Sequence, residues 1–144
     1  MDWTKAETNT HQDHVVAHVV GATVLGSFVA DEAAHFVLDI GFIWTILLDG
    51  EMALTLERTA LAELNVSEAE RAELSADVHA LYESGPHAPL VRVAPAPDDC
   101  RITAVEFYTA EARRRLLIEC EGANLCVETA LATGAVEIEP QPAA

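Results

Sequence analysis

The stretch FIWTILLDGEMALTL, residues Phe42–Leu56, decides our interpretation of the fold. Two apolar runs flank Asp49 and Gly50, and Asp-Gly in this context favours a type I′ β-hairpin because both central residues need positive φ. The first run, Phe42–Leu48, is apolar on both faces of a strand, so we expect it to be the central strand of a three-stranded meander. Asp49 then serves the turn, and Glu51 starts the return strand facing water.

The turn length also predicts the register of this hairpin. With only two residues in the turn, Thr45 lies opposite Leu54 on one face of the pair. On the other face, Ile46 lies opposite Ala53.

Two longer apolar runs, Val15–Ala30 and Ala33–Leu48, flank residues 31–32 upstream. Both are rich in Val, Ile and Phe and neither has a helical period, so we expect two long antiparallel strands. A turn at residues 31–32 places Gly26 opposite Val37. The expected points of bulging or bending are Gly21, Gly26 and Gly41.

The clearest helix covers residues 68–83. Ser67 is its N-cap and Glu70 completes a capping-box pattern. Gly85, followed by proline, ends it. An apolar stripe at helical spacing should cover one face of the sheet and contains Leu74, Val78, Leu81 and Tyr82.

These elements predict an α+β fold, in which a bent antiparallel meander sheet of about 5–7 strands in all packs against one main helix, residues 68–83. Residues 1–13 are expected to form a flexible polar arm, residues 14–139 a single domain, and residues 140–144 a disordered tail. Residues 85–99 form a proline-rich connector within the domain. Residues 110–121 fit a strand or a helix, and their alternation of apolar and charged residues favours a strand.

The charge balance is strongly acidic. Eight Lys and Arg face 24 Asp and Glu, which gives a formal net charge of −16. This field repels phosphate backbones and attracts cations or a basic protein, so we expect no nucleic-acid partner.

The sequence also bears on location. The start of the chain has no basic region leading into an apolar core, so we expect no signal peptide. The long apolar runs are shorter than the roughly 20 residues of a membrane-spanning helix. We therefore expect a cytoplasmic protein without a membrane partner.

Histidines are the first candidates for chemistry. His11, His14 and His18 are spaced so that a helix would place them on one face, where they could hold zinc or iron. On the expected strand, His14 and His18 lie about 13 Å apart at ~3.3 Å per residue, which is too far for one ion. The same spacing separates His35 from Asp39, two further candidate functional residues, and the expected pairing sets His18 opposite Thr45.

Asp39 has three interpretations: a turn or bulge before Gly41, a buried structural hydrogen bond, or a functional acid. Arg113 and Arg115 share one face of the expected strand and form a patch for ion pairs or for an anion. Cys120 and Cys126 flank an expected hairpin tip and could lie opposite each other as a redox pair; inert buried thiols are the alternative.

No catalytic constellation and no cofactor motif emerges. We therefore expect a non-enzymatic binding protein that recognises a basic protein partner or itself, as a homo-oligomer such as a dimer. One alternative is a small metal-dependent enzyme or metal-binding protein that uses the histidines with Asp39 or Glu51. Another is a carrier that encloses an apolar small molecule.

Overall fold

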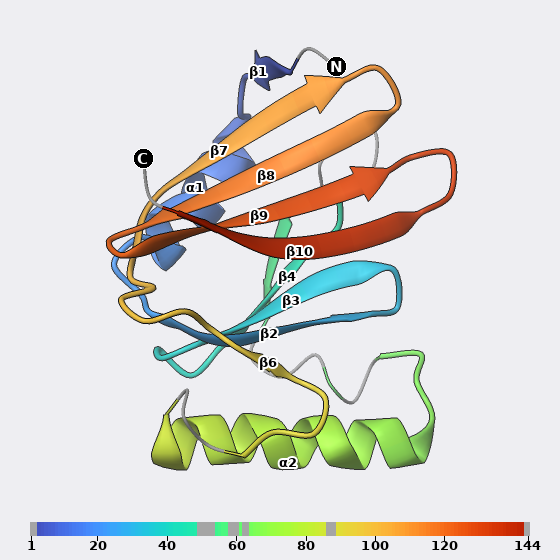
Figure 1. Cartoon of the computed structure of the whole chain (residues 1–144). Helices are drawn as coiled ribbons and strands as arrows, with labels where there is room; N and C mark the ends of the chain where they lie inside the picture. Colours follow the sequence, from blue (N-terminus) through green and yellow to red (C-terminus); the bar gives the residue numbers. More distant parts are fainter. Residues whose placement is uncertain (1–2, 49–53, 58–60, 62–63, 86–88, 143–144) are drawn as a thin grey trace.

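The computed structural model describes residues 3–48, 54–57, 61, 64–85 and 89–142. Within these residues the chain forms two five-stranded antiparallel sheets and two helices (Figure 1). The outer sheet has the strand order β1-β7-β8-β9-β10, and the central sheet has the order β5-β4-β3-β2-β6. The bounds are β1 Thr4–Ala6, α1 Thr10–Val19, β2 Val24–Ala30, β3 Ala33–Leu38, β4 Ile43–Ile46, β5 Leu54–Glu57, α2 Glu68–Ser84, β6 Ala94–Pro95, β7 Ile102–Ala110, β8 Arg113–Cys120, β9 Ala123–Ala130 and β10 Ala135–Pro142.

The fold is α+β with antiparallel sheets and one main helix, as the sequence predicted. The described residues form ten strands, more than the 5–7 expected, and they also form α1, a helix that was not expected. Residues expected to be a flexible arm instead contribute β1, which pairs with β7, and the start of α1. At the other end, β10 continues through Pro142, into the residues expected to be a disordered tail.

The central sheet is buried on both faces. One face packs against the outer sheet and α1 through a core that includes Phe36, Trp44 and Phe107. The other face packs against α2 through a second core that includes Ile43 and Leu81. Figure 1 shows the resulting layers, with α2 below the central sheet and the outer sheet above it. The expected double burial of β4, between β3 and β5 in a meander, is confirmed.

The turn between β2 and β3 falls at Asp31 and Glu32, as predicted. Both residues have positive φ, 53° and 61°, although neither is glycine. Gly26 lies opposite Val37, also as predicted, and a bulge lies between Val24 and Gly26. A Cβ at Gly26 would lie only 2.8 Å from a methyl group of Val93.

The strand predicted at the start of the first apolar run is wrong, because residues Thr10–Val19 form α1. The Asn9 side chain accepts a hydrogen bond from the Gln12 backbone, and the Gln12 side chain caps the Asn9 backbone in return. This capping box starts a helix that buries Val15 and Val19 in the core. The cap and this burial outweigh the β-propensity of the three valines in α1.

The second apolar run is also divided. It leaves the sheet after Leu38 and returns at Ile43, so one long strand over residues 33–48 was a wrong prediction. Asp39 lies in the intervening turn, where its Oδ1 accepts a hydrogen bond from the Thr23 backbone at 2.9 Å. Gly41 supplies a positive φ of 88° in the same turn.

The predicted register of β4 with β5 is wrong by one residue. Thr45 lies opposite Thr55, and Ile46 lies opposite Leu54. This pairing requires an odd number of residues in the connection, which a two-residue turn cannot supply. The expected turn residues Asp49 and Gly50, together with Glu51, lie outside the described residues.

Helix α2 begins as predicted and ends at Ser84, one residue later than predicted. The Ser67 hydroxyl accepts a hydrogen bond from the Glu70 backbone at 3.1 Å, and Gly85 ends the helix with a positive φ. Leu74, Val78 and Leu81 are buried as expected. Tyr82, assigned to the same stripe, is 41% exposed, so the apolar stripe is narrower than predicted.

The buried face of α2 also carries a carboxylate, Asp77, whose residue is only 2% exposed. It accepts hydrogen bonds from the consecutive backbone N–H groups of Val91, Arg92 and Val93, at 2.7–3.1 Å. Burial by itself raises the pKa of this carboxyl. The three backbone N–H groups outweigh burial and hold the pKa below its ordinary value of 3.8. Asp77 therefore fixes the segment that leads into β6.

We expect Asp77→Asn to lower the free energy of unfolding at pH 7 by about 2–3 kcal/mol, because the amide cannot satisfy all three N–H groups. Since the folded pKa lies below 3.8, the contribution of Asp77 is present above that pH and is lost as the pH falls through the folded pKa. Urea unfolding from pH 7 to pH 2 should show a smaller acid-induced loss in D77N than in the wild type. Glu83→Gln, on the exposed face of the same helix, should match the wild type; equal behaviour of D77N and E83Q would contradict this role.

Candidate functional site

One edge of the central sheet is only partly covered. Strand β6 pairs with β2 at Gly26 and Ser27 and then ends. The Leu25 carbonyl oxygen accepts a hydrogen bond from the backbone N–H of Ala96, just after β6, and Ser27 pairs with Ala94 on the same side of β2. Alternate residues of a strand direct their backbone groups to one side, so the N–H and C=O of Val29 point past the covered part of the edge. No strand among the described residues pairs with Val29 there.

Strand β10 forms a second open edge. It pairs with β9 on one side, and no strand in the described part of the chain pairs with its other side. Pro140 has no N–H to donate to the β9 ladder, so its nitrogen belongs to the open side. By alternation, the backbone N–H groups of Val136 and Ile138 also face the open side. Their side chains pack on the core, while Glu137 and Glu139 are exposed.

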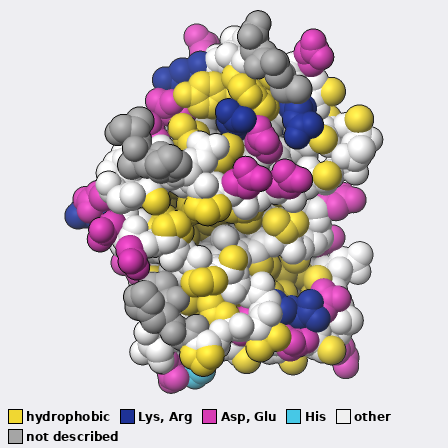
Figure 2. All heavy atoms as spheres, in the orientation of Figure 1, with side chains coloured by type: hydrophobic (Ala, Val, Ile, Leu, Met, Phe, Trp, Pro, Cys, Tyr) yellow, Lys and Arg dark blue, Asp and Glu magenta, His cyan; other side chains and the backbone are white. Residues whose placement is uncertain are grey.

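These two open edges border a single hollow of about 400 Å³, which we call the edge groove. In the face of the molecule shown in Figure 2, hydrophobic side chains gather in the middle and acidic side chains lie above them. Val29, on one wall, is 48% exposed. The lining residues are Ser27, Phe28, Val29, Arg92, Ala94, Val136, Glu137, Ile138 and Glu139.

A smaller hollow of about 330 Å³ shares Phe28, Val29 and Arg92 with the edge groove and reaches α2 at Glu70. Arg92 lines both hollows, and its guanidinium is paired with Glu73 at 3.2 Å. The positive charge at this place is thus compensated, whereas Glu137 and Glu139 leave the groove rim acidic. The groove therefore combines apolar walls, backbone hydrogen-bonding groups and negative charge.

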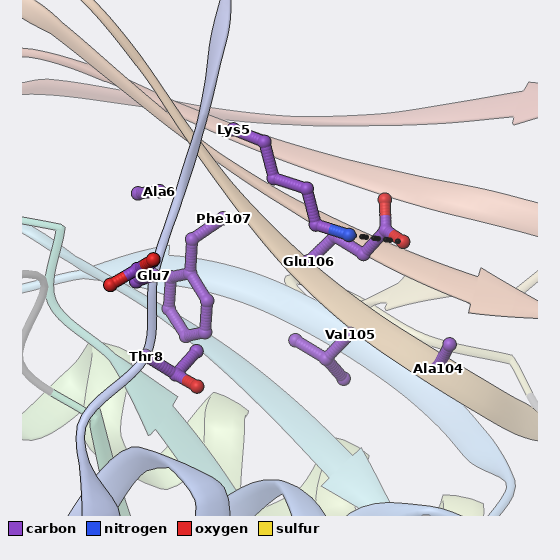
Figure 3. Close-up of a pocket in the computed structure, with 8 residues that line it drawn as sticks. All are labelled: Lys5, Ala6, Glu7, Thr8, Ala104, Val105, Glu106 and Phe107. Carbon is purple, nitrogen blue, oxygen red and sulfur yellow. Dashed lines mark hydrogen bonds and ion pairs between the residues drawn. The ribbon is translucent and has the colours of Figure 1, made fainter.

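The largest of these hollows, about 600 Å³, lies where β1 ends beside β7 (Figure 3). Lys5 reaches across it to Glu106 at 3.3 Å, and the Tyr108 hydroxyl donates to the same carboxylate. The hydrogen bond from Tyr108 is the main cause that lowers the pKa of Glu106, with Lys5 contributing. Because its opposite charges are already paired, this hollow offers less to a ligand than the edge groove does.

His11, His14 and His18 lie exposed on α1, so the strand separation of 13 Å does not apply. The ring centroids of His14 and His18 are 6.4 Å apart, and His18 Nδ1 lies 2.9 Å from the His14 carbonyl oxygen. Among the residues that the structure describes, no three His, Cys, Asp or Glu side chains are grouped as ligands of one metal ion.

His35 is buried in β3. Its Nδ1 lies 3.0 Å from the Thr45 hydroxyl, its Nε2 lies 3.0 Å from the Ala30 carbonyl oxygen, and its ring stacks on Phe28. Thr45 therefore lies opposite His35, and the expected pairing with His18 is wrong. The carbonyl can only accept, so Nε2 carries the proton and Nδ1 accepts from the hydroxyl. Both ring nitrogens thus serve the packing of the central sheet.

Arg113 and Arg115 lie on β8 beside one carboxylate. Arg115 is bonded to Glu128 by two nitrogens at 2.5 and 3.0 Å, and Arg113 lies 4.0 Å from the same side chain. The Trp3 ring covers the Arg115 guanidinium at 4.2 Å. This cation–π contact and the ion pairs occupy the two guanidinium groups within the chain.

The predicted opposition of Cys120 and Cys126 is wrong, because Cys126 lies opposite Leu117. The β8–β9 tip lies at residues 121–122, closer to Cys120 than expected. The Cys120 Sγ instead lies 3.4 Å from that of Cys100, and all three thiols are buried. The contact lowers the pKa of Cys100 and raises that of Cys120, while burial raises the pKa of Cys126.

Comparisons with protein-family models, with curated proteins and with solved structures gave no match to this chain. Among the described residues, neither helix is long and apolar enough to cross a membrane. Any assignment of function therefore depends on the geometry of the molecule itself.

We expect oxidised glutathione to link Cys100 to Cys120 when it is present during refolding, before both thiols become buried. The Cys100 thiolate attacks the disulfide and releases one glutathione, and the Cys120 thiolate then displaces the second, so that glutathione takes up two electrons and two protons. Peptide mapping by mass spectrometry should find this link in the wild type and in Cys126→Ser, but not in Cys100→Ser. A link between Cys120 and Cys126 under folded conditions would contradict the placement.

Proposed function

We propose that the protein binds an extended, basic segment of another protein in the edge groove. The observation that carries the proposal is that two open strand edges border one hollow whose rim is acidic. A binding module of this kind needs no cofactor.

The backbone groups explain why the ligand would be extended. A strand laid in the groove would pair with one of its two edges, either through the N–H and C=O groups of Val29 or through those of Val136 and Ile138. It would not pair with both, because β2 and β10 approach to within 8 Å between Cα atoms, less than two interstrand spacings of about 4.8 Å. Strand addition of this type draws its affinity from main-chain hydrogen bonds and its specificity from alternate side chains. The apolar walls, including Val29 and Phe28, suit alternate apolar side chains of that strand.

The charges explain why the ligand would be basic. A chain of net charge −16 attracts cationic segments, and Glu137 and Glu139 place two acids at the rim. A second copy of this chain would be a poor occupant, because β10 paired with β10 would bring these glutamates against each other. Self-association through another surface stays a prediction.

A carrier of apolar small molecules has less support. The space between the two sheets is filled by large side chains that are 0–1% exposed, among them Phe36, Trp44 and Phe107. An enclosed ligand would have to displace this core, and close-packed interiors resist such insertion.

The test uses the full chain and a labelled peptide of alternating Val and Lys, six residues long, in fluorescence anisotropy. We expect it to bind and to weaken as salt rises, while the matching Val-Glu peptide does not bind. Val29→Lys should weaken binding roughly 10-fold, because it adds like charge to the apolar wall. The matched variant is Val20→Lys, at a residue that is 42% exposed and does not line the groove; it should bind like the wild type.

A second pair of variants isolates the rim. Glu137→Gln with Glu139→Gln should weaken the Val-Lys peptide roughly 2- to 10-fold, as expected for two exposed ion pairs. Glu83→Gln with Glu111→Gln removes the same charge away from the groove and should have little effect. Equal loss in both double variants, or equal binding of the Val-Lys and Val-Glu peptides, would refute recognition by the groove.

A further inference from the structure

We propose that His14 and His18 form an exchangeable site for a divalent transition metal on the exposed face of α1. Helix α1 contributes no residue to the edge groove, so this proposal is independent of the proposed function. It concerns zinc, nickel, cobalt or copper, because neutral imidazole suits these ions, whereas magnesium and calcium prefer oxygen ligands.

The helix supplies the spacing. His14 and His18 are four residues apart, so their side chains lie on one face, one turn above the other. Both residues are exposed, and their rings meet edge to face with centroids 6.4 Å apart. Two imidazoles that share one metal at 2.0–2.1 Å from each nitrogen have centroids roughly 5–6 Å apart. A small rotation of an exposed side chain closes this difference, and such rotations are fast.

A hydrogen bond prepares His18 as a ligand. Its Nδ1 lies 2.9 Å from the His14 carbonyl oxygen, which can only accept, so Nδ1 carries the proton. The lone pair of the neutral ring is then on Nε2, the nitrogen that would bind the metal. Metal-binding histidines usually have this arrangement, in which a backbone carbonyl holds the other ring nitrogen. The helix thus sets the tautomer before any metal arrives.

The remaining coordination positions define what kind of site this is. No third ligand group completes it within the described residues, so water or a ligand from another molecule would fill the other positions. A two-histidine site with open positions exchanges its metal and is not a structural zinc centre. The net charge of −16 raises the local concentration of cations but does not by itself select a metal.

The experiment is a calorimetric titration of the full, EDTA-treated and dialysed chain with Ni²⁺ or Zn²⁺, in a large excess of Mg²⁺. The magnesium suppresses diffuse attraction to the acidic surface. We expect one binding equivalent in the wild type, and losses of roughly 10-fold or more in affinity for His14→Ala and for His18→Ala. Both positions are exposed on a helix and alanine favours helix, so the variants should fold, as circular dichroism can verify.

Two histidines serve as controls. His79, exposed on α2 beside Glu83, should be replaceable by alanine without effect on the titration. His11→Ala should change the affinity less than about 3-fold, because the pair and not the triad holds the ion. Binding that is absent, that magnesium displaces, or that H18A leaves unchanged would overturn the site. A loss in H11A as large as in H18A would overturn the two-residue assignment.

Discussion

Burial of the central sheet on both faces is the constraint on which the rest of the structure depends. Strands β3 and β4 carry apolar side chains on alternate faces, so each face must be covered. The outer sheet and α1 cover one face, and α2 covers the other. With both faces used, the parts of this sheet that remain available are its edges, and this is why the candidate site lies at an edge.

The covering elements also determine how much of that edge is open. Asp77 of α2 accepts hydrogen bonds from three consecutive backbone N–H groups of the segment before β6 and so holds that segment against the helix. Gly26 has no side chain, which lets β2 approach Val93 and Leu81 closely. Strand β6 is therefore short, and the β2 edge beyond Ser27 stays unpaired by any described strand. A structural carboxylate and a glycine thus shape the groove without lining it.

Charge is distributed so that few cations remain uncompensated near the groove and on the outer sheet. Arg92, Arg115 and Lys5 are each paired with a glutamate. In a chain of net charge −16, such pairs leave the acids on the groove rim as the main electrostatic signal there. Negative charge is therefore concentrated beside the apolar walls of the groove. This combination, more than the net charge alone, favours binding of a basic segment.

The sequence by itself determined the elements whose signals are local. The cap at Ser67, the glycine after α2, the turn at residues 31–32 and the double burial of β4 were all readable, because each depends on neighbours in the chain. Helix α1 was readable in part, since Asn9 and Gln12 form a capping box that the valine-rich run obscured. Asp77 likewise occupies a helical spacing shared with Leu74 and Leu81, which marks a buried acid.

Only the tertiary structure decided the rest, because it depends on contacts between distant segments. The split of the second apolar run at Asp39 is fixed by a bond to Thr23, and the β4–β5 register by the length of their connection. The edge groove joins residues 27–29 to residues 136–139, and Cys100 meets Cys120 through a connector between two sheets. No local sequence pattern encodes these long-range contacts, because they follow from how the layers stack once both faces of the central sheet are covered.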